Sequence, residues 1–124
     1  MHIVIPGRPY TKKNSQRITK DWKTGKSRIR QSEQYERYEE SCLWILSQYR
    51  GKTFDGPIQM TVTYWMPNRQ SWPDLLGVLQ ATADILQKAK IITNDRNVVS
   101  LDGSRIAGVD AKNPRVEIEI KEME

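Results

Sequence analysis

Apolar and polar residues alternate along two segments of the chain. In residues 58–66 every even position is apolar, and three of the four odd positions are glutamine or threonine. This two-residue period predicts a strand with one buried face. The same period at 116–121 predicts a last strand, and the short apolar run at 2–5 predicts a first one.

Two other segments repeat their apolar residues at helical spacing. The first helix is predicted at about 33–49, with Ser32 as its N-cap. The second is predicted at about 74–88, with Pro73 setting its entry and Asp74 at its cap or first turn. The apolar stripe of the second helix consists of Leu75, Leu76, Leu79, Ala83 and Leu86. After a polar turn at 93–96, a strand broken near Gly103 is predicted from Asn97 to about Ala107.

The predicted order is strand, hairpin, helix, strand, helix, strand, strand. Its 124 residues suit one domain, 1–124. We therefore expect an α/β (α+β) fold with a mixed sheet of about four strands, two main helices and a basic N-terminal hairpin or loop.

Positive charge is concentrated near the N-terminus. The chain has 20 Lys and Arg against 15 Asp and Glu, and nine of the basic residues fall within 8–30 beside a single acid, Asp21. A turn at 23–26 would make 16–22 and 26–31 the arms of an exposed hairpin. A basic hairpin of this kind favours contact with nucleic-acid phosphates, although a merely solvated hairpin is the structural alternative. The predicted DNA-contacting residues are Lys12, Lys13, Asn14, Arg17, Lys20, Lys23, Lys26, Arg28 and Arg30.

Composition excludes several other classes of protein. One cysteine, Cys42, and one histidine, His2, cannot form an internal disulfide or a zinc site. Cys42 lies among apolar residues and is predicted to be a core residue. No apolar segment suits a signal peptide or a membrane span, so a cytoplasmic location without membrane association is expected, and no small-molecule cofactor is predicted.

Asp74 and Asp95 are the candidate ligands of a metal ion. Hydrolysis of a phosphodiester needs added negative charge to be stabilised, and carboxylates achieve this by holding Mg²⁺ or Mn²⁺. The helix between them spans roughly 20 Å, and an extended 89–95 segment can return about that distance, so the two acids can converge. Asp84 lies too far along the same helix to share an ion with Asp74. The structural alternatives are an N-cap for Asp74, a turn residue for Asp95 and a solvated or hydrogen-bonded helix residue for Asp84.

Three passages of the chain resemble the RusA family of Holliday-junction resolvases, small endonucleases often carried by phages and prophages. They are IPGRPYTKKNSQRI with its asparagine Asn14, the helix start SEQYERY, and MPNRQSWPDLLGVLQATADILQKAKIITNDRNVVSLD. The third passage is similar to a family pattern of Asp-x-Asp-Asn, a later Lys, a helical Asp-x-Leu and an acid before a strand. On that pattern Asp74 matches the first acid, Asp84 opens the Asp-x-Leu element, and Asp95 in the Asn94-Asp95 pair matches the metal-binding acid.

Three positions depart from the family pattern. Leu76 stands where the family has its second Asp, Gly77 where it has Asn, and Gln80 where it has the catalytic Lys. One possibility is activity through Asp74 and Asp95 with a third acid, Asp102 or an Asp84 from a partner subunit, and with Lys12 or Lys13 replacing the lysine. A second is binding of branched DNA without cleavage. A third is a shifted local register, against which the surrounding apolar pattern argues.

The resemblance implies a homodimer that makes paired nicks in four-way junctions with Mg²⁺ or Mn²⁺. Two-fold symmetry would present two equivalent sites to two equivalent strands. Asp84, Asp102, Gln80, Asn94 and Arg96 are possible auxiliary site residues. The competing hypotheses are a non-cleaving relative that binds branched DNA and a phage accessory protein that binds single strands or RNA.

Overall fold

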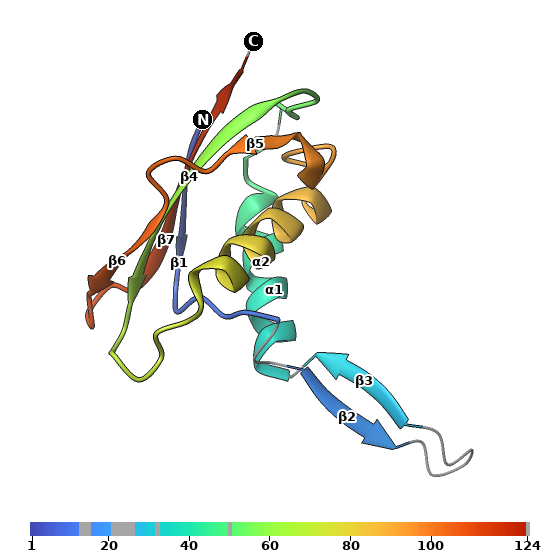
Figure 1. The fold of residues 1–124 in the computed structure, drawn as a ribbon, viewed down its shortest axis with the longest axis vertical. Helices are drawn as coiled ribbons and strands as arrows, with labels where there is room; N and C mark the ends of the chain where they lie inside the picture. Colours follow the sequence, from blue (N-terminus) through green and yellow to red (C-terminus); the bar gives the residue numbers. More distant parts are fainter. Residues whose placement is uncertain (13–15, 21–26, 32, 50, 124) are drawn as a thin grey trace.

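A computed structural model describes residues 1–12, 16–20, 27–31, 33–49 and 51–123 of the chain. A mixed five-stranded sheet forms one layer of the fold (Figure 1). β7 pairs antiparallel with β1 on one side and with β4 on the other, and β4 pairs in parallel with both β5 and β6. The strands are β1 (His2–Pro6), β7 (Arg115–Glu122), β4 (Ile58–Met66), β5 (Val98–Ser100) and β6 (Arg105–Val109).

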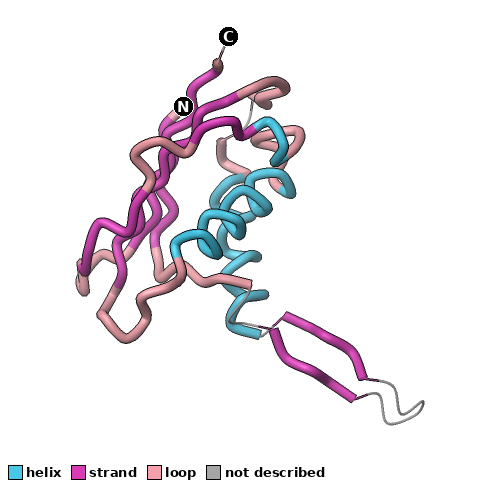
Figure 2. Tube along the Cα trace, viewed as in Figure 1, coloured by secondary structure: helices cyan, strands magenta, loops and turns pink. Residues whose placement is uncertain are grey.

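Two helices cover one face of this sheet (Figure 2). They are α1 (Glu33–Leu46) and α2 (Leu75–Lys88), and they contact each other. The chain leaves β4, passes through α2 and returns parallel to β4, as a strand–helix–strand crossover must. The fold is thus the predicted α+β arrangement, with one more strand than expected.

The core lies between the helices and the sheet. Along β4 every even residue is buried and every odd residue is partly exposed, which confirms the predicted alternation. The buried face of the sheet packs against apolar residues of both helices, including Cys42 and Leu46 of α1 and Leu86 of α2. Burial raises the pKa of the Cys42 thiol to about 11, so it remains a neutral core residue at physiological pH, as predicted.

Two predicted elements have different bounds in the structure. α1 ends three residues before position 49, because Gln48 and Tyr49 donate backbone hydrogen bonds three residues back and form a tight turn. The strand predicted at 97–107 begins as a short 3₁₀ helix, η1 (Asp95–Asn97), and continues as β5 and β6. The break between β5 and β6 contains Gly103 with φ +83°, a conformation that glycine adopts without strain.

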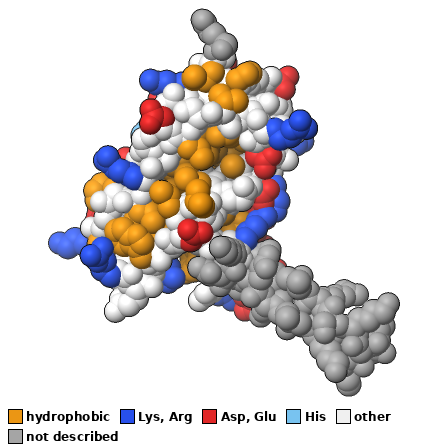
Figure 3. All heavy atoms as spheres, in the orientation of Figure 1, with side chains coloured by type: hydrophobic (Ala, Val, Ile, Leu, Met, Phe, Trp, Pro, Cys, Tyr) orange, Lys and Arg blue, Asp and Glu red, His pale blue; other side chains and the backbone are white. Residues whose placement is uncertain are grey.

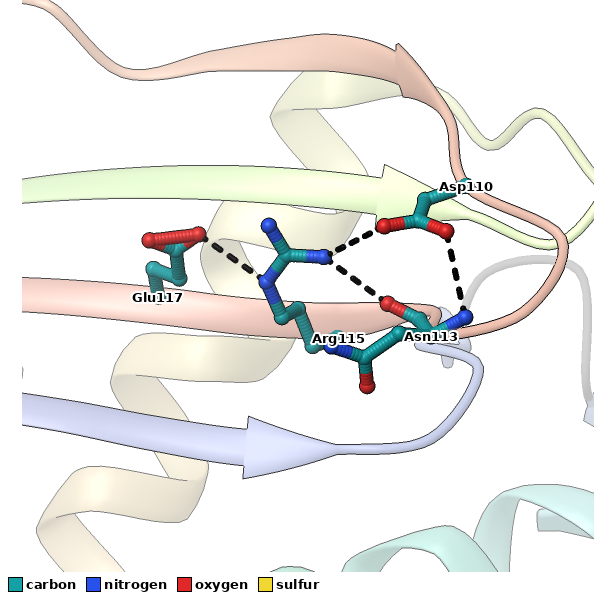
Figure 4. Close-up of polar contacts among 4 residues, drawn as sticks. All are labelled: Asp110, Asn113, Arg115 and Glu117. Atoms are coloured by element: carbon teal, nitrogen blue, oxygen red, sulfur yellow. Dashed lines mark hydrogen bonds and ion pairs between the residues drawn. The ribbon is translucent and has the colours of Figure 1, made fainter.

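An ion-pair network on the open face of the sheet fixes the turn between β6 and β7. Figure 4 shows Arg115 donating to the Asp110 carboxylate at 2.9 Å and to Glu117 at 3.1 Å. The same guanidinium also donates to the carbonyl of Asn113 and lies 5.1 Å from the ring centroid of Trp65. These partners all lie in the β6–β7 turn, in β7 itself or in the neighbouring strand β4, so we assign Arg115 a structural role.

The basic N-terminal segment contains the predicted hairpin. β2 (Gln16–Lys20) and β3 (Ser27–Gln31) pair antiparallel and form a second, two-stranded sheet (Figure 1). Arg17, Lys20, Arg28 and Arg30 belong to these strands. The described residues do not include several predicted positions of this segment, namely Lys13, Asn14, Trp22, Lys23, Lys26 and the predicted cap Ser32.

The C-terminus of α2 offers a direct test of backbone strain. Lys90 has φ 62°, and the amides of Lys90 and Ile91 donate to the carbonyls of Gln87 and Leu86, which together form a Schellman motif. Glycine is preferred at the left-handed position because a Cβ there is unfavourable. We expect Lys90→Gly to raise the free energy of unfolding by about 1 kcal/mol, measured by urea denaturation. Lys88→Gly, inside the same helix, is the control and should lower it by a similar amount. A loss of stability in Lys90→Gly would contradict this account.

Candidate active site and nucleic-acid interface

A groove of about 430 Å³ runs between α2 and the segment that follows it. Along α2 it is lined by Leu76, Leu79, Gln80 and Ala83, which share one helix face. Asp95, Val98 and Leu101 line the opposite side, and Met60 of β4 also borders the groove. Figure 3 shows hydrophobic side chains gathered on the molecular face where α2 and β5 lie. The groove therefore combines an apolar lining with one carboxylate and one amide.

Asp95 is held at this groove by its backbone. Its amide donates to the Gln87 side chain at 2.8 Å, and the preceding Asn94 caps η1 by accepting from the Arg96 amide at 2.9 Å. Among the described residues, none donates a hydrogen bond or ion pair to the Asp95 carboxylate. A half-buried carboxylate that none of these described residues engages is available to a cation or to a substrate group.

Asp74 lies at the N-terminus of α2, where one oxygen accepts from the Gly77 amide at 3.2 Å. A Cβ added at Gly77 would meet this oxygen at 3.3 Å and the Thr11 side chain at 3.6 Å, so Asp74, Gly77 and Thr11 are neighbours. Asp74 is therefore the N-cap that the sequence offered as its structural alternative. It does not line the groove that Asp95 lines.

Asp84 forms an ion pair with Lys12 across the contact between α2 and the N-terminal segment. The Lys12 ammonium also lies 6.0 Å from the ring centroid of Tyr35 in α1. Burial, together with the charges of Glu39 and Asp84, raises the pKa of Tyr35 well above its ordinary value, so this phenol remains neutral. Lys12 is therefore engaged in the ion pair with Asp84. It does not line the groove that contains Gln80, the position at which the family pattern has a lysine.

The remaining auxiliary candidates divide between the groove and its surroundings. Gln80 lines the groove directly. Asn94 and Arg96 belong to the turn that positions Asp95. Asp102 lies in the turn after β5, where its carbonyl accepts from Thr61 at 2.9 Å. Asp102 is not among the groove-lining residues.

The carboxylates of the described residues form no closed cage for Mg²⁺. In the described part of the chain, no three His, Cys, Asp or Glu side chains lie close enough together to hold a metal ion. Mg²⁺ in nucleic-acid enzymes is commonly held by one or two carboxylates, water and substrate phosphates. Asp95 fits that arrangement, because its carboxylate is a hard oxygen ligand that the described residues do not already engage. It does not fit a site in which protein side chains supply every ligand.

A second charged and aromatic surface was only partly identified from the sequence. Arg8 lies over the ring of Tyr10 at 4.5 Å, and Tyr10 packs against Tyr38 of α1 at 5.7 Å between centroids. From the sequence alone Tyr10 has two interpretations, stacking on an exposed base or packing, and packing is the favoured one. Arg69 lies over Trp72 at 5.2 Å in the loop before α2. Arg37 and Arg69 carried no motif, and only the tertiary structure places Arg37 beside the same hollow as Arg8 and Arg69 over Trp72.

Neither helix in the described part of the chain has the length and apolar surface needed to cross a bilayer. A helix-backed mixed sheet, a two-stranded hairpin with basic residues in its sequence and a groove lined by the Asp95 carboxylate define a small α+β protein suited to nucleic acid. The family model described as endodeoxyribonuclease RusA matches residues 6–121 of the 124-residue chain. The chain belongs to the RusA endodeoxyribonuclease family. No match is found among curated protein sequences.

Proposed function

We propose that this chain is a structure-specific endodeoxyribonuclease that makes paired nicks in four-way DNA junctions as a homodimer, with Mg²⁺ or Mn²⁺. Membership of the RusA family supports action on branched DNA. The observation that carries the proposal is the uncommitted Asp95 carboxylate at the edge of the groove beside α2. We propose that this action on recombining DNA takes place in the cytoplasm of a bacterial or phage-infected cell.

Asp95 would hold the metal ion at the groove, and Asp74, which caps α2 outside the groove lining, stays the predicted second ligand. When bound, the ion supplies Lewis-acid polarisation of the scissile phosphate and lowers the pKa of bound water. Asp95 contributes a carboxylate whose backbone is fixed by Gln87 and by the Asn94 cap. Gln80 can donate an amide hydrogen to a phosphate oxygen, although it brings no positive charge. The basic hairpin would grip the DNA backbone without reading its sequence.

A second function, binding of four-way junctions without cleavage, is favoured by the side chain at position 76. Leu76 is 75% exposed at the groove, where the family pattern places its second metal-binding Asp. An exposed leucine contributes no ligand, and Gln80 leaves the same groove without a cation. On this alternative the RusA scaffold still recognises branched DNA through phosphate contacts.

Labelled four-way junctions and linear duplexes of the same sequences distinguish these functions. The nuclease proposal expects paired nicks in junction DNA with Mg²⁺ or Mn²⁺ and none in EDTA. The binding proposal expects a salt-sensitive complex that prefers junctions over duplexes and leaves the DNA intact in both metals. Equal affinity for junction and duplex would contradict both.

A further inference from the structure

Two adjoining hollows lie between the end of β1, the first turns of α1 and the loop before α2. Their volumes are about 170 and 420 Å³, and both are lined by Arg8, Tyr10 and Gln34. We call the pair the Arg8 trough. Arg37 and Tyr38 line it on the α1 side, and Trp72 lines it on the side of the loop. It is separate from the groove that contains Asp95, with which it shares no lining residue.

The Arg8 trough carries positive charge and no negative charge. Its lining contains two arginines and no aspartate or glutamate. Among the described residues, no carboxylate forms an ion pair with Arg8. Among the described residues Arg37 pairs with Glu33 one helical turn away, at 3.8 Å and with both side chains strongly exposed. Such a surface ion pair contributes little free energy, so the guanidinium groups of Arg8 and Arg37 are both able to bind an anion.

The aromatic residues of the trough are already ordered. Tyr10 is held between the Arg8 guanidinium at 4.5 Å and the Tyr38 ring at 5.7 Å. Arg8 is exposed, and its guanidinium lies over the Tyr10 ring. Nucleic-acid bases stack on aromatic rings and on guanidinium planes of this kind. Little ordering of side chains is needed for a base to bind here.

We propose that the Arg8 trough binds a short single-stranded segment of DNA, with its phosphates on Arg8 and Arg37 and an unstacked base against the Arg8–Tyr10 pair. This inference rests on the proposed action at branched DNA, where strands separate from their duplex partners. A paired duplex keeps its bases inside the helix and cannot place one in a hollow. An acidic peptide would use the charge of the trough and leave its stacking surface unused.

The test measures the affinity of a short fluorescent oligothymidylate by anisotropy across a series of salt concentrations. Arg8→Gln combined with Arg37→Gln should weaken binding at least tenfold. The slope of log affinity against log salt should fall by about 1.4, since each phosphate contact on a single strand contributes about 0.7. The matched control is Arg105→Gln with Lys121→Gln, which removes two exposed charges away from the trough and should change neither value appreciably.

Stacking is tested at Tyr10. Tyr10→Leu should weaken oligothymidylate binding about tenfold, whereas Tyr10→Phe keeps the ring and should bind as the wild type does. Circular dichroism melting verifies that each variant is folded. Equal binding by the trough and control variants would overturn the inference, as would competition by polyglutamate as strong as that by unlabelled oligothymidylate. If the wild type binds four-way junctions and not oligothymidylate, only the trough inference fails, and if it binds neither, the proposed function fails as well.

Discussion

Leu76→Asp combined with Gln80→Lys is expected to raise Mg²⁺-dependent nicking of four-way junctions by about 100-fold or more. Both side chains are exposed and line the same groove as Asp95, so the double variant adds a carboxylate and an ammonium group beside an existing carboxylate. A preorganised charge at a phosphoryl-transfer site contributes rate factors of about 10²–10³. Single-turnover nicking of a labelled junction measures the change.

The matched control for this gain of activity is Leu76→Asn with Gln80→Met. It keeps the side-chain sizes close to those of the active variant and adds no charge. Stability should change little in either variant, because both positions are exposed and an acid in the first turn of α2 is favourable. If both double variants nick at the rate of the wild type, the groove beside α2 is not the hydrolytic site.

Asp95→Asn is expected to lower Mg²⁺-dependent nicking by at least 100-fold, in the wild type and in the Leu76→Asp, Gln80→Lys background. The amide cannot replace an anionic ligand, whereas the backbone bond from residue 95 to Gln87 is kept. Junction affinity should stay the same or increase, because a negative charge near the DNA backbone is removed. The rate is measured by nicking and the affinity by gel shift.

Asp55→Asn is the control for this variant. It removes the same charge from an exposed residue that does not line the groove and has no predicted role in the site, so nicking should be unaffected. Asp95→Asn is informative for either candidate function when it is made both in the wild type and in the Leu76→Asp, Gln80→Lys variant. If either protein still nicks junctions at its former rate after Asp95→Asn, Asp95 has no part in the mechanism.

The strand and helix periods predicted most of the fold. In β4 the burial of the side chains alternates at every residue, as the sequence pattern predicted. It does so because helices cover one face of the sheet and the other face is open. The predicted break near Gly103 was confirmed, since β5 and β6 pair with different parts of β4. The end of α1 was less predictable, because Tyr49 continues the helical apolar spacing although the residues after Leu46 form a turn.

The candidate site was only partly predictable. The family pattern identified Leu76, Gln80 and Asp95 as related positions, and the structure brings them to one groove. It also places Asp74 against Thr11 and gives Asp84 an ion pair with Lys12. Neither neighbour could be inferred from spacing, because residues 11 and 12 are more than sixty positions from α2.

The sequence by itself determined the order and type of the elements and the basic hairpin, and its resemblance to the family predicted that Leu76 and Gln80 replace two functional groups of the family pattern. These properties depend on local periodicity and on the chemistry of single side chains. The tertiary structure alone decided which acids share a groove, which cation is paired with Asp84, and that Arg8 and Arg37 meet around Tyr10. Those outcomes depend on how α1 and α2 pack on the sheet, which brings together residues that are far apart along the chain.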